Sequence, residues 1–345
     1  MYRHSWLVGA LSVVVCWGAV TPAQTTTEKL LMALRNAEAQ AVRACLIDAK
    51  AANVADEDGV TALMYAALYA DADTLKQLLA RGAQVNAQSK AGLTALLLAL
   101  GDAEKVKVLL AHGAEPNLRT PQGHTALELA AGRAGAVAVV RLLLEHKADL
   151  AQGNVMAAAA RNGDVEILKL LLAHGADPNN KNKLSGQPAA STKRAELNRN
   201  DGLPRSPFLL TPSMPVGEGT PLMYAAYARN HAAVRFLLEH GADVNARNNG
   251  NSTALMLAAQ MGDLAIVKTL LAHGAEVNAQ NVYGYSALLY AVAAEGNEPA
   301  LLKALLAKDA SIHLKAKDGL TPLALASRKG KTETVRLLTQ AGATE

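Results

Sequence analysis

Aromatic residues are scarce in this chain, at 3% of 345 residues, and both tryptophans, Trp6 and Trp17, fall within the first twenty. Half of the residues are nevertheless hydrophobic, so Ala, Leu and Val must form the core of the remainder. Small and medium aliphatic side chains suit closely stacked short helices. They do not suit the bulky core of a β-sandwich or of a cofactor-binding enzyme.

Cysteine is equally scarce, and one of the two residues, Cys16, lies in a distinctive N-terminal segment. A short basic start is followed by an apolar run over residues 6–20 and by small residues at Thr21 and Ala23. This order predicts a secretory signal peptide over residues 1–23, because the run is too short to span a bilayer comfortably. Two alternatives stay open: an uncleaved anchor or buried first helix, and a lipoprotein acylated at Cys16, although Val15 stands where a small residue is usual.

Cleavage would leave Cys45 as the last cysteine, without an intramolecular partner. An exported chain with one cysteine must obtain its stability from packing rather than from disulfides. Cys45 lies in the mostly apolar run 42–47, so we expect it to be a buried core residue.

One phrase of Thr or Ser, a small residue and Leu returns along the chain, often followed by an Ala-Ala pair. A second phrase, Leu-Leu followed by Gly-Ala, comes after most copies of the first. Thr61 and Thr94 are 33 residues apart, as are Thr220 and Thr253. The repeating units begin near Leu30, Thr61, Thr94, Thr125, Asn154, Thr220, Thr253, Ser286 and Thr321.

The phrases have a direct physical reading as two short helices per unit. Threonine caps a first helix by accepting hydrogen bonds from free amides, and proline at the next position, as in Pro221 and Pro322, suits its first turn. Gly163, Gly262 and Gly330 fall between the two helices, where a residue with positive φ ends the first. Leu-Leu ends the second helix, and Gly-Ala followed by Asn opens the connecting turn.

These phrases and their spacing resemble the ankyrin-repeat family, whose signature is Thr-Pro-Leu-His-x-Ala. The resemblance implies an all-α solenoid of about nine helix-turn-helix units joined by β-turns or hairpin loops. Units 1–5 are expected over residues 24–179, with a degenerate first cap, and units 6–9 over residues 218–345. Two departures stand out: the signature histidine is replaced, for example by Met64 and Glu128, and the turn between Lys147 and Asn154 is short.

A long insertion separates the fifth and sixth units at residues 180–217. Gly175 and Thr220 are 45 residues apart, where the other units place 12 between these positions. The segment contains five prolines and a charge excess of +4, which equals the net charge of the whole chain. It is either a partner-binding arm anchored by Phe208, or a tolerated loop or decayed repeat.

The sequence predicts no catalytic residue, no cofactor and no metal, and hence no enzyme. It has no Gly-x-Ser-x-Gly elbow, no phosphate-binding glycine loop and no His-Glu-x-x-His motif. Histidine does recur once per unit, but stacked helices lie about 8–10 Å apart, too far for one zinc ion. These histidines are expected to be polar helix-end residues: His112, His146, His174, His240 and His273.

Binding to another protein is therefore the expected function, through the concave face of the solenoid. Sparse aromatics and export argue against nucleic acid, and no second long apolar run predicts a membrane contact after cleavage. In ankyrin proteins, partner contacts come mainly from positions just before the threonine and just after the Ala-Ala pair. The residues expected to bind a partner are Leu68, Tyr69, Arg133, Arg161, Tyr227, Met261, Tyr283, Tyr285, Arg328 and Lys329, with Phe208 in the insertion.

Two hypotheses follow for the role of the protein in the cell. The first is a monomeric scaffold or protective binding protein in the periplasm, with an extracellular location as the second possibility. The alternative is an inhibitor or immunity protein that blocks an exported enzyme, with the insertion occupying the cleft of its target.

Overall fold

The computed structural model describes residues 26–36, 52–151, 154–181, 219–294 and 298–344. The signal segment 1–23, Cys45 and Phe208 lie outside these ranges, as does the insertion apart from its first two residues. The described residues form helices and two isolated β-bridges, with no strand among them. The predicted all-α class is confirmed.

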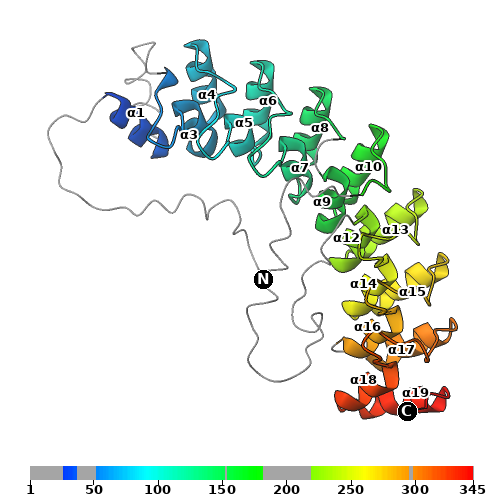
Figure 1. Ribbon diagram of the computed structural model, residues 1–345. Coiled ribbons are helices and arrows are strands. Elements are labelled where there is room, and N and C mark those ends of the chain that lie inside the picture. The colour runs from blue at the N-terminus through cyan, green and yellow to red at the C-terminus, as the bar shows by residue number, and fades with distance from the viewer. Residues whose placement is uncertain (1–25, 37–51, 152–153, 182–218, 295–297, 345) are drawn as a thin grey trace, which may run out of the picture.

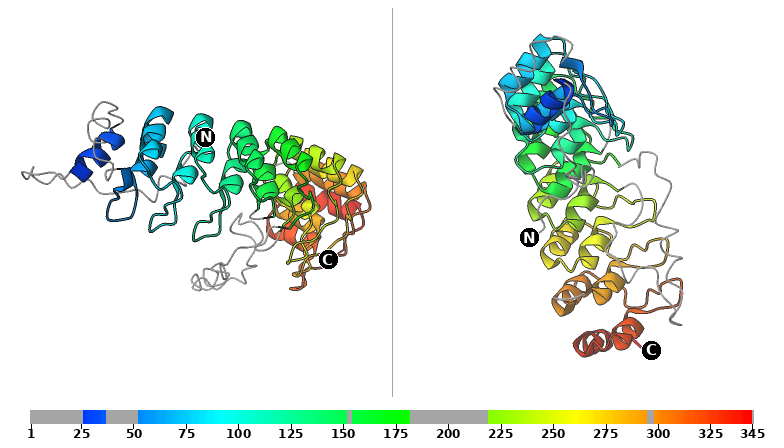
Figure 2. Two further views of the ribbon diagram at one scale, coloured as in Figure 1. Left: turned by 90° about the horizontal axis from the view of Figure 1, so that it is seen from above. Right: turned by 90° about the vertical axis from the view of Figure 1, so that its left-hand side faces the viewer.

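The described helices form a curved stack of eight pairs, preceded by a single helix, α1 (Thr26–Arg35) (Figure 1). The first helix of each pair lies on the inner side of the arc, and these inner helices are α3 (Ala62–Tyr69), α5 (Ala95–Leu98), α7 (Ala126–Ala131), α9 (Val155–Asn162), α12 (Pro221–Tyr227), α14 (Ala254–Gln260), α16 (Ala287–Ala293) and α18 (Pro322–Arg328). The outer helices are α4 (Ala72–Ala80), α6 (Ala103–Ala111), α8 (Val137–Glu145), α10 (Val165–Ala173), α13 (His231–Glu239), α15 (Leu264–Ala272), α17 (Glu298–Leu306) and α19 (Thr332–Gln340). The loops that connect successive pairs project to one side of the stack (Figure 2).

Side-chain caps begin both kinds of helix. Thr61 accepts from the amide of Met64, and the equivalent Thr or Ser caps every other inner helix except α9, as the sequence predicted. The outer helices α4, α6, α10 and α15 begin at aspartates, Asp71, Asp102, Asp164 and Asp263, whose carboxylates accept from amides of the first turn. A carboxylate also interacts favourably with the positive end of the helix dipole.

Residues in the left-handed region end four of the inner helices, α9, α12, α14 and α18. Gly163, Gly262 and Gly330 have φ of 82°, 67° and 66°, which confirms the sequence prediction. Glycine reaches this region without the steric cost that a Cβ atom brings. Arg229 takes the same place in the turn between α12 and α13, with φ of 60°.

The recurring histidines end the outer helices, as predicted. Each lies with Nδ1 at 2.7–2.9 Å from the carbonyl oxygen four residues earlier, for example His273 on Thr269. In four of the five units this carbonyl also accepts the backbone amide of the same histidine, so the ring adds a second hydrogen bond at the end of the helix.

The core is one continuous apolar cluster that runs from Leu30 to Ala343. Alanines such as Ala66 and Ala259 are fully buried and let neighbouring helices approach closely. Met64, Met256 and Leu289, which replace the signature histidine, are also buried. Apolar contact thus takes the place of any histidine hydrogen bond there, as the sequence suggested.

A ladder of asparagine side chains joins neighbouring units on their connecting turns. In each rung, Nδ2 donates to the carbonyl that follows the next outer helix, over 2.9–3.2 Å. The same side chain accepts, through Oδ1, from an amide two residues further on, over 2.7–2.9 Å. The six described rungs are Asn53, Asn86, Asn117, Asn179, Asn245 and Asn278.

The stack continues directly across the insertion. Helix α9 packs on α12, and Asn179 bonds to Gly241 and Asp243, 62 and 64 residues away in sequence. The ladder is interrupted one unit earlier, where Ala151 stands in the asparagine position of the short turn before α9. His313 stands in the equivalent position before the last pair, so the described part of the chain is one solenoid whose ladder lacks two rungs.

Gly262→Val should lower the free energy of unfolding by about 1 kcal/mol or more, because valine is strained at positive φ. Urea unfolding of residues 24–345 would measure the difference. Ala265→Val is the matched control, since it adds the same side chain at an exposed position of α15 and costs only helix propensity. Equal stability of Gly262→Val and the parent would contradict the described end of α14.

Asn245→Asp should cost about 1 kcal/mol of stability, because a carboxylate can accept from Glu276 but cannot donate to the Gly274 carbonyl. Asn249→Asp, at an exposed position in the next loop, makes the same chemical change and should be nearly neutral. Thermal unfolding of both variants tests this. If both melt like the parent, the ladder contributes nothing to stacking.

Candidate functional site

The candidate site is the inner face of the arc, formed by the inner helices and by the loops beside them (Figures 1 and 2). In several of these loops, one polar side chain accepts hydrogen bonds from two backbone amides. Asn281 Oδ1 accepts from Tyr283 and Tyr285, and Asn248 Oδ1 accepts from Gly250 and Ser252. These bonds close each tip into a rigid turn.

Neighbouring tips are also tied to one another by backbone bonds. The amide of Val282 donates to the Gly250 carbonyl, and that of Lys317 donates to the Tyr283 carbonyl, both over 2.9 Å. Gly284 is required between two tips, because a Cβ there would lie 2.9 Å from the amide nitrogen of Lys317. The tips thus form a preorganised edge, which lowers the entropic cost of binding.

Buried tyrosines anchor some of these loops to the inner helices. Tyr65 donates to Asp56 over 2.7 Å, and the hydroxyl of Tyr290 accepts from Asn281 over 2.9 Å. Burial raises the pKa of Tyr290 to about 12. This hydroxyl therefore stays protonated at physiological pH and serves the structure.

Most residues predicted to bind a partner are accessible on the inner helices and tips. Tyr69 and Tyr283 are 44% and 43% exposed, and with Met32 they are the exposed large hydrophobic residues among those described. Arg161, Arg328 and Lys329 are exposed, and Leu68, Arg133, Tyr227 and Met261 are half-buried. The Lys329 ammonium also donates to the Ala293 carbonyl at the end of α16.

Tyr285 needs a correction. It is 4% exposed, and its ring lies 5.4 Å from that of Tyr290, centroid to centroid. Alternation along the loop turns Tyr283 outward and Tyr285 into the core. Tyr285 is therefore a packing residue, while Phe208 lies outside the described residues.

A basic group that the sequence analysis missed lies beside Tyr227. Arg229 Nε and His231 Nε2 contact the same oxygen of Asp263, at 3.1 and 2.8 Å. Burial would raise the pKa of Asp263, but hydrogen bonds from the Ile266 amide, His231 and Arg229 lower it. A signal was present in the sequence, since arginine stands where other units have glycine.

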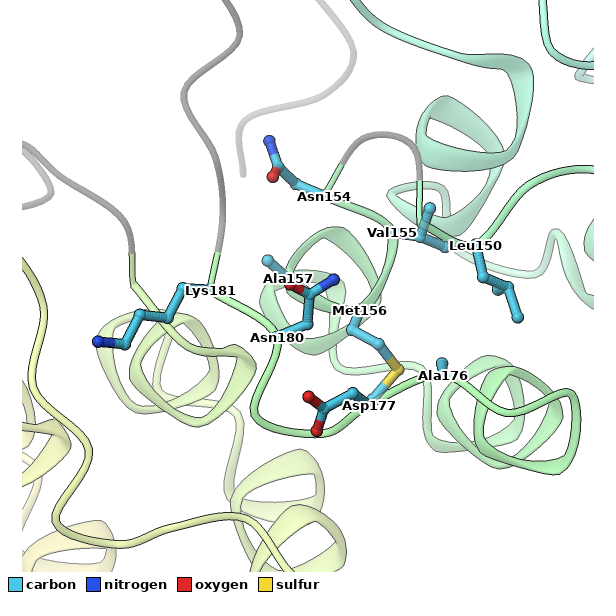
Figure 3. A pocket seen from close by; sticks show the side chains of 9 residues that line it. All are labelled: Leu150, Asn154, Val155, Met156, Ala157, Ala176, Asp177, Asn180 and Lys181. Atoms are coloured by element: carbon cyan, nitrogen blue, oxygen red, sulfur yellow. The ribbon is translucent and has the colours of Figure 1, made fainter.

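One shallow pocket opens where the turn before α9 is short (Figure 3). It encloses about 310 Å³, open solvent included, and its lining residues are Leu150, Asn154, Val155, Met156, Ala157, Ala176, Asp177, Asn180 and Lys181. Asn154 makes no side-chain cap to α9. The first residues of this helix, Val155, Met156 and Ala157, are nevertheless buried.

Nowhere in the described ranges do three or more His, Cys, Asp or Glu side chains gather closely enough to hold a metal ion. None of the described helices is long and apolar enough to cross a bilayer.

Comparisons with known proteins agree with the architecture. A family model for ankyrin repeats in three copies matches residues 67–154, 94–182 and 207–281, and a single ankyrin repeat matches residues 318–344. The crystal structure of the human ASB11 ankyrin repeat domain is 25% identical, with a TM-score of 0.55, over 71% of this chain and 96% of that one. No curated protein matches the sequence.

The resemblance noted in the sequence is confirmed by these matches. Ankyrin repeats indicate a protein–protein interaction module with protein partners, and their fold is typical of non-catalytic binding scaffolds. Because the repeat matches span more than half of the residues and the helix pairs stack accordingly, the chain belongs to the ankyrin-repeat family.

Proposed function

We propose that this protein is a non-catalytic scaffold or protective binding protein of the periplasm, which holds one protein partner on the inner face of its arc. The observation that supports this most directly is the exposure of Tyr69 and Tyr283 on that face. Tyrosine, methionine and arginine are enriched at protein interfaces, and the tip that carries Tyr283 is held by side-chain and backbone hydrogen bonds.

The inner face differs from the outer helices in the residues that it exposes. The outer helices present charged residues such as Lys76, Arg141 and Lys169 to solvent. Lys76 and Lys169 form ion pairs with an aspartate and a glutamate one turn earlier on the same helix. No large hydrophobic residue is exposed on the described outer helices. The inner face is therefore the better binding surface.

The double variant Tyr69→Ala, Tyr283→Ala should weaken partner binding by about 2 kcal/mol, or roughly thirtyfold, because exposed tyrosines are typical hot-spot residues. The partner is first identified by co-purification from a periplasmic extract, and its affinity is then measured by calorimetry. The double variant Arg141→Ala, Lys169→Ala, which shortens two exposed side chains on the outer helices, is the control. Unchanged affinity of the double variant would contradict binding by the inner face.

The periplasmic location is tested by expressing residues 1–345 in a Gram-negative host. We expect the periplasmic fraction to contain a chain that begins at Gln24, because the small residues Thr21 and Ala23 suit signal peptidase. Mass spectrometry of the purified chain identifies its first residue. Intact precursor confined to the cytoplasm would contradict the proposal.

A further inference from the structure

A row of three arginines crosses the middle of the solenoid, at the turns that join inner to outer helices. Arg133 follows α7, Arg161 is in the last turn of α9, and Arg229 follows α12. Arg133 and Arg161 each lie two residues before a glycine with positive φ, whereas Arg229 occupies the place of that glycine. We call these three residues the arginine row.

The turns that carry the arginine row are neighbours in space. The side-chain amide of Asn230 donates to the carbonyls of Ala160 and Arg161, so the turn of Arg229 sits on the turn of Arg161. Helix α7 packs on α9, and α9 packs on α12. Three arginines far apart in sequence therefore occupy consecutive units.

Positive charge in the row exceeds the negative charge that could neutralise it. Arg133 and Arg161 form no ion pair with any described carboxylate. Asp164, near Arg161, accepts from the Ile167 amide as the cap of α10. Asp263 contacts both Arg229 and His231, yet 61% of the Arg229 side chain stays exposed.

The backbone at Arg229 is a second, independent observation. A residue with a Cβ atom is strained at φ of 60°, and the corresponding turns use Gly163, Gly262 and Gly330. Strain of this kind is concentrated at functional sites. An arginine kept where glycine would be relaxed thus points to a use for its guanidinium.

We propose that the arginine row binds an acidic, extended segment of the protein partner, a proposal that rests on the protein-binding function above. Guanidinium groups bind carboxylates through two parallel hydrogen bonds. Tyr227, two residues before Arg229 and partly exposed, adds an apolar contact beside the row.

The repeat spacing predicts the pattern of acids in that segment. Stacked helices lie about 8–10 Å apart, and an extended chain in the polyproline II conformation advances about 3.1 Å per residue with three residues per turn. One unit therefore matches about three residues of the partner. Carboxylates at every third position would meet successive arginines.

Fluorescence anisotropy with the full mature chain tests the proposal directly. The probe is a labelled extended peptide with Glu at every third position, and its control has the same composition with the glutamates adjacent. We expect saturable binding of the spaced peptide that weakens with added salt. The variant Arg133→Gln, Arg161→Gln, Arg229→Gly should bind at least about tenfold more weakly. Glycine relieves the strain at residue 229, and Asp263 keeps His231 and the Ile266 amide as partners when Arg229 is lost, so thermal unfolding should show a folded variant.

The matched control variant is Arg141→Gln, Lys169→Gln, Arg235→Gln, which removes the same charge from the outer helices of the same three units. It should bind the spaced peptide like the parent. Four results overturn the proposal: no saturable binding by the parent, equal binding of both peptides, equal losses in both triple variants, or preference of the row for a single-stranded oligonucleotide over the peptide.

The affinity of the co-purified protein partner for each variant distinguishes failure of this proposal from failure of the broader binding function. If it binds the parent and the arginine-row variant equally, the acidic segment is wrong while binding by the inner face stands. If the tyrosine double variant also binds it equally, the broader function fails as well.

Discussion

Stacking between neighbours is the constraint on which this structure depends, because no helix pair here can bury its own apolar face. Each pair presents Ala and Leu to the units on both sides, and the buried cluster is continuous from Leu30 to Ala343. The asparagine ladder adds a polar connection at the turns. Rigidity, curvature and the inner face all follow from contacts between units rather than within them.

The sequence predicted the features that one unit determines by itself. Threonine caps, glycine ends such as Gly262 and histidine helix ends all depend on residues a few positions apart, so repeated phrases were enough to infer them. The joints were harder to foresee, because they combine residues of two units. Asn245 looked like a turn residue, yet it holds the next unit through both a donor and an acceptor, which explains why asparagine and not aspartate recurs there.

The surface was predicted only in part, for a related reason. Spacing indicated which positions lie near the inner face, but it could not separate Tyr283 from Tyr285, since the local loop geometry turns one outward and buries the other. Arg229 was missed because it occupies a backbone position that glycine fills elsewhere. The role proposed for its side chain depends on Arg161 and Asp263, which belong to the units on either side.

The most direct test of a continuous stack is calorimetric unfolding of residues 24–345 with residues 184–216 deleted, which restores the spacing of 12 residues between Gly175 and Thr220. The contacts of α9 with α12 and of Asn179 with Gly241 do not involve the deleted residues. We therefore expect one cooperative transition at an unchanged Tm. Two separate transitions, or a large fall in Tm, would contradict a continuous stack across the insertion.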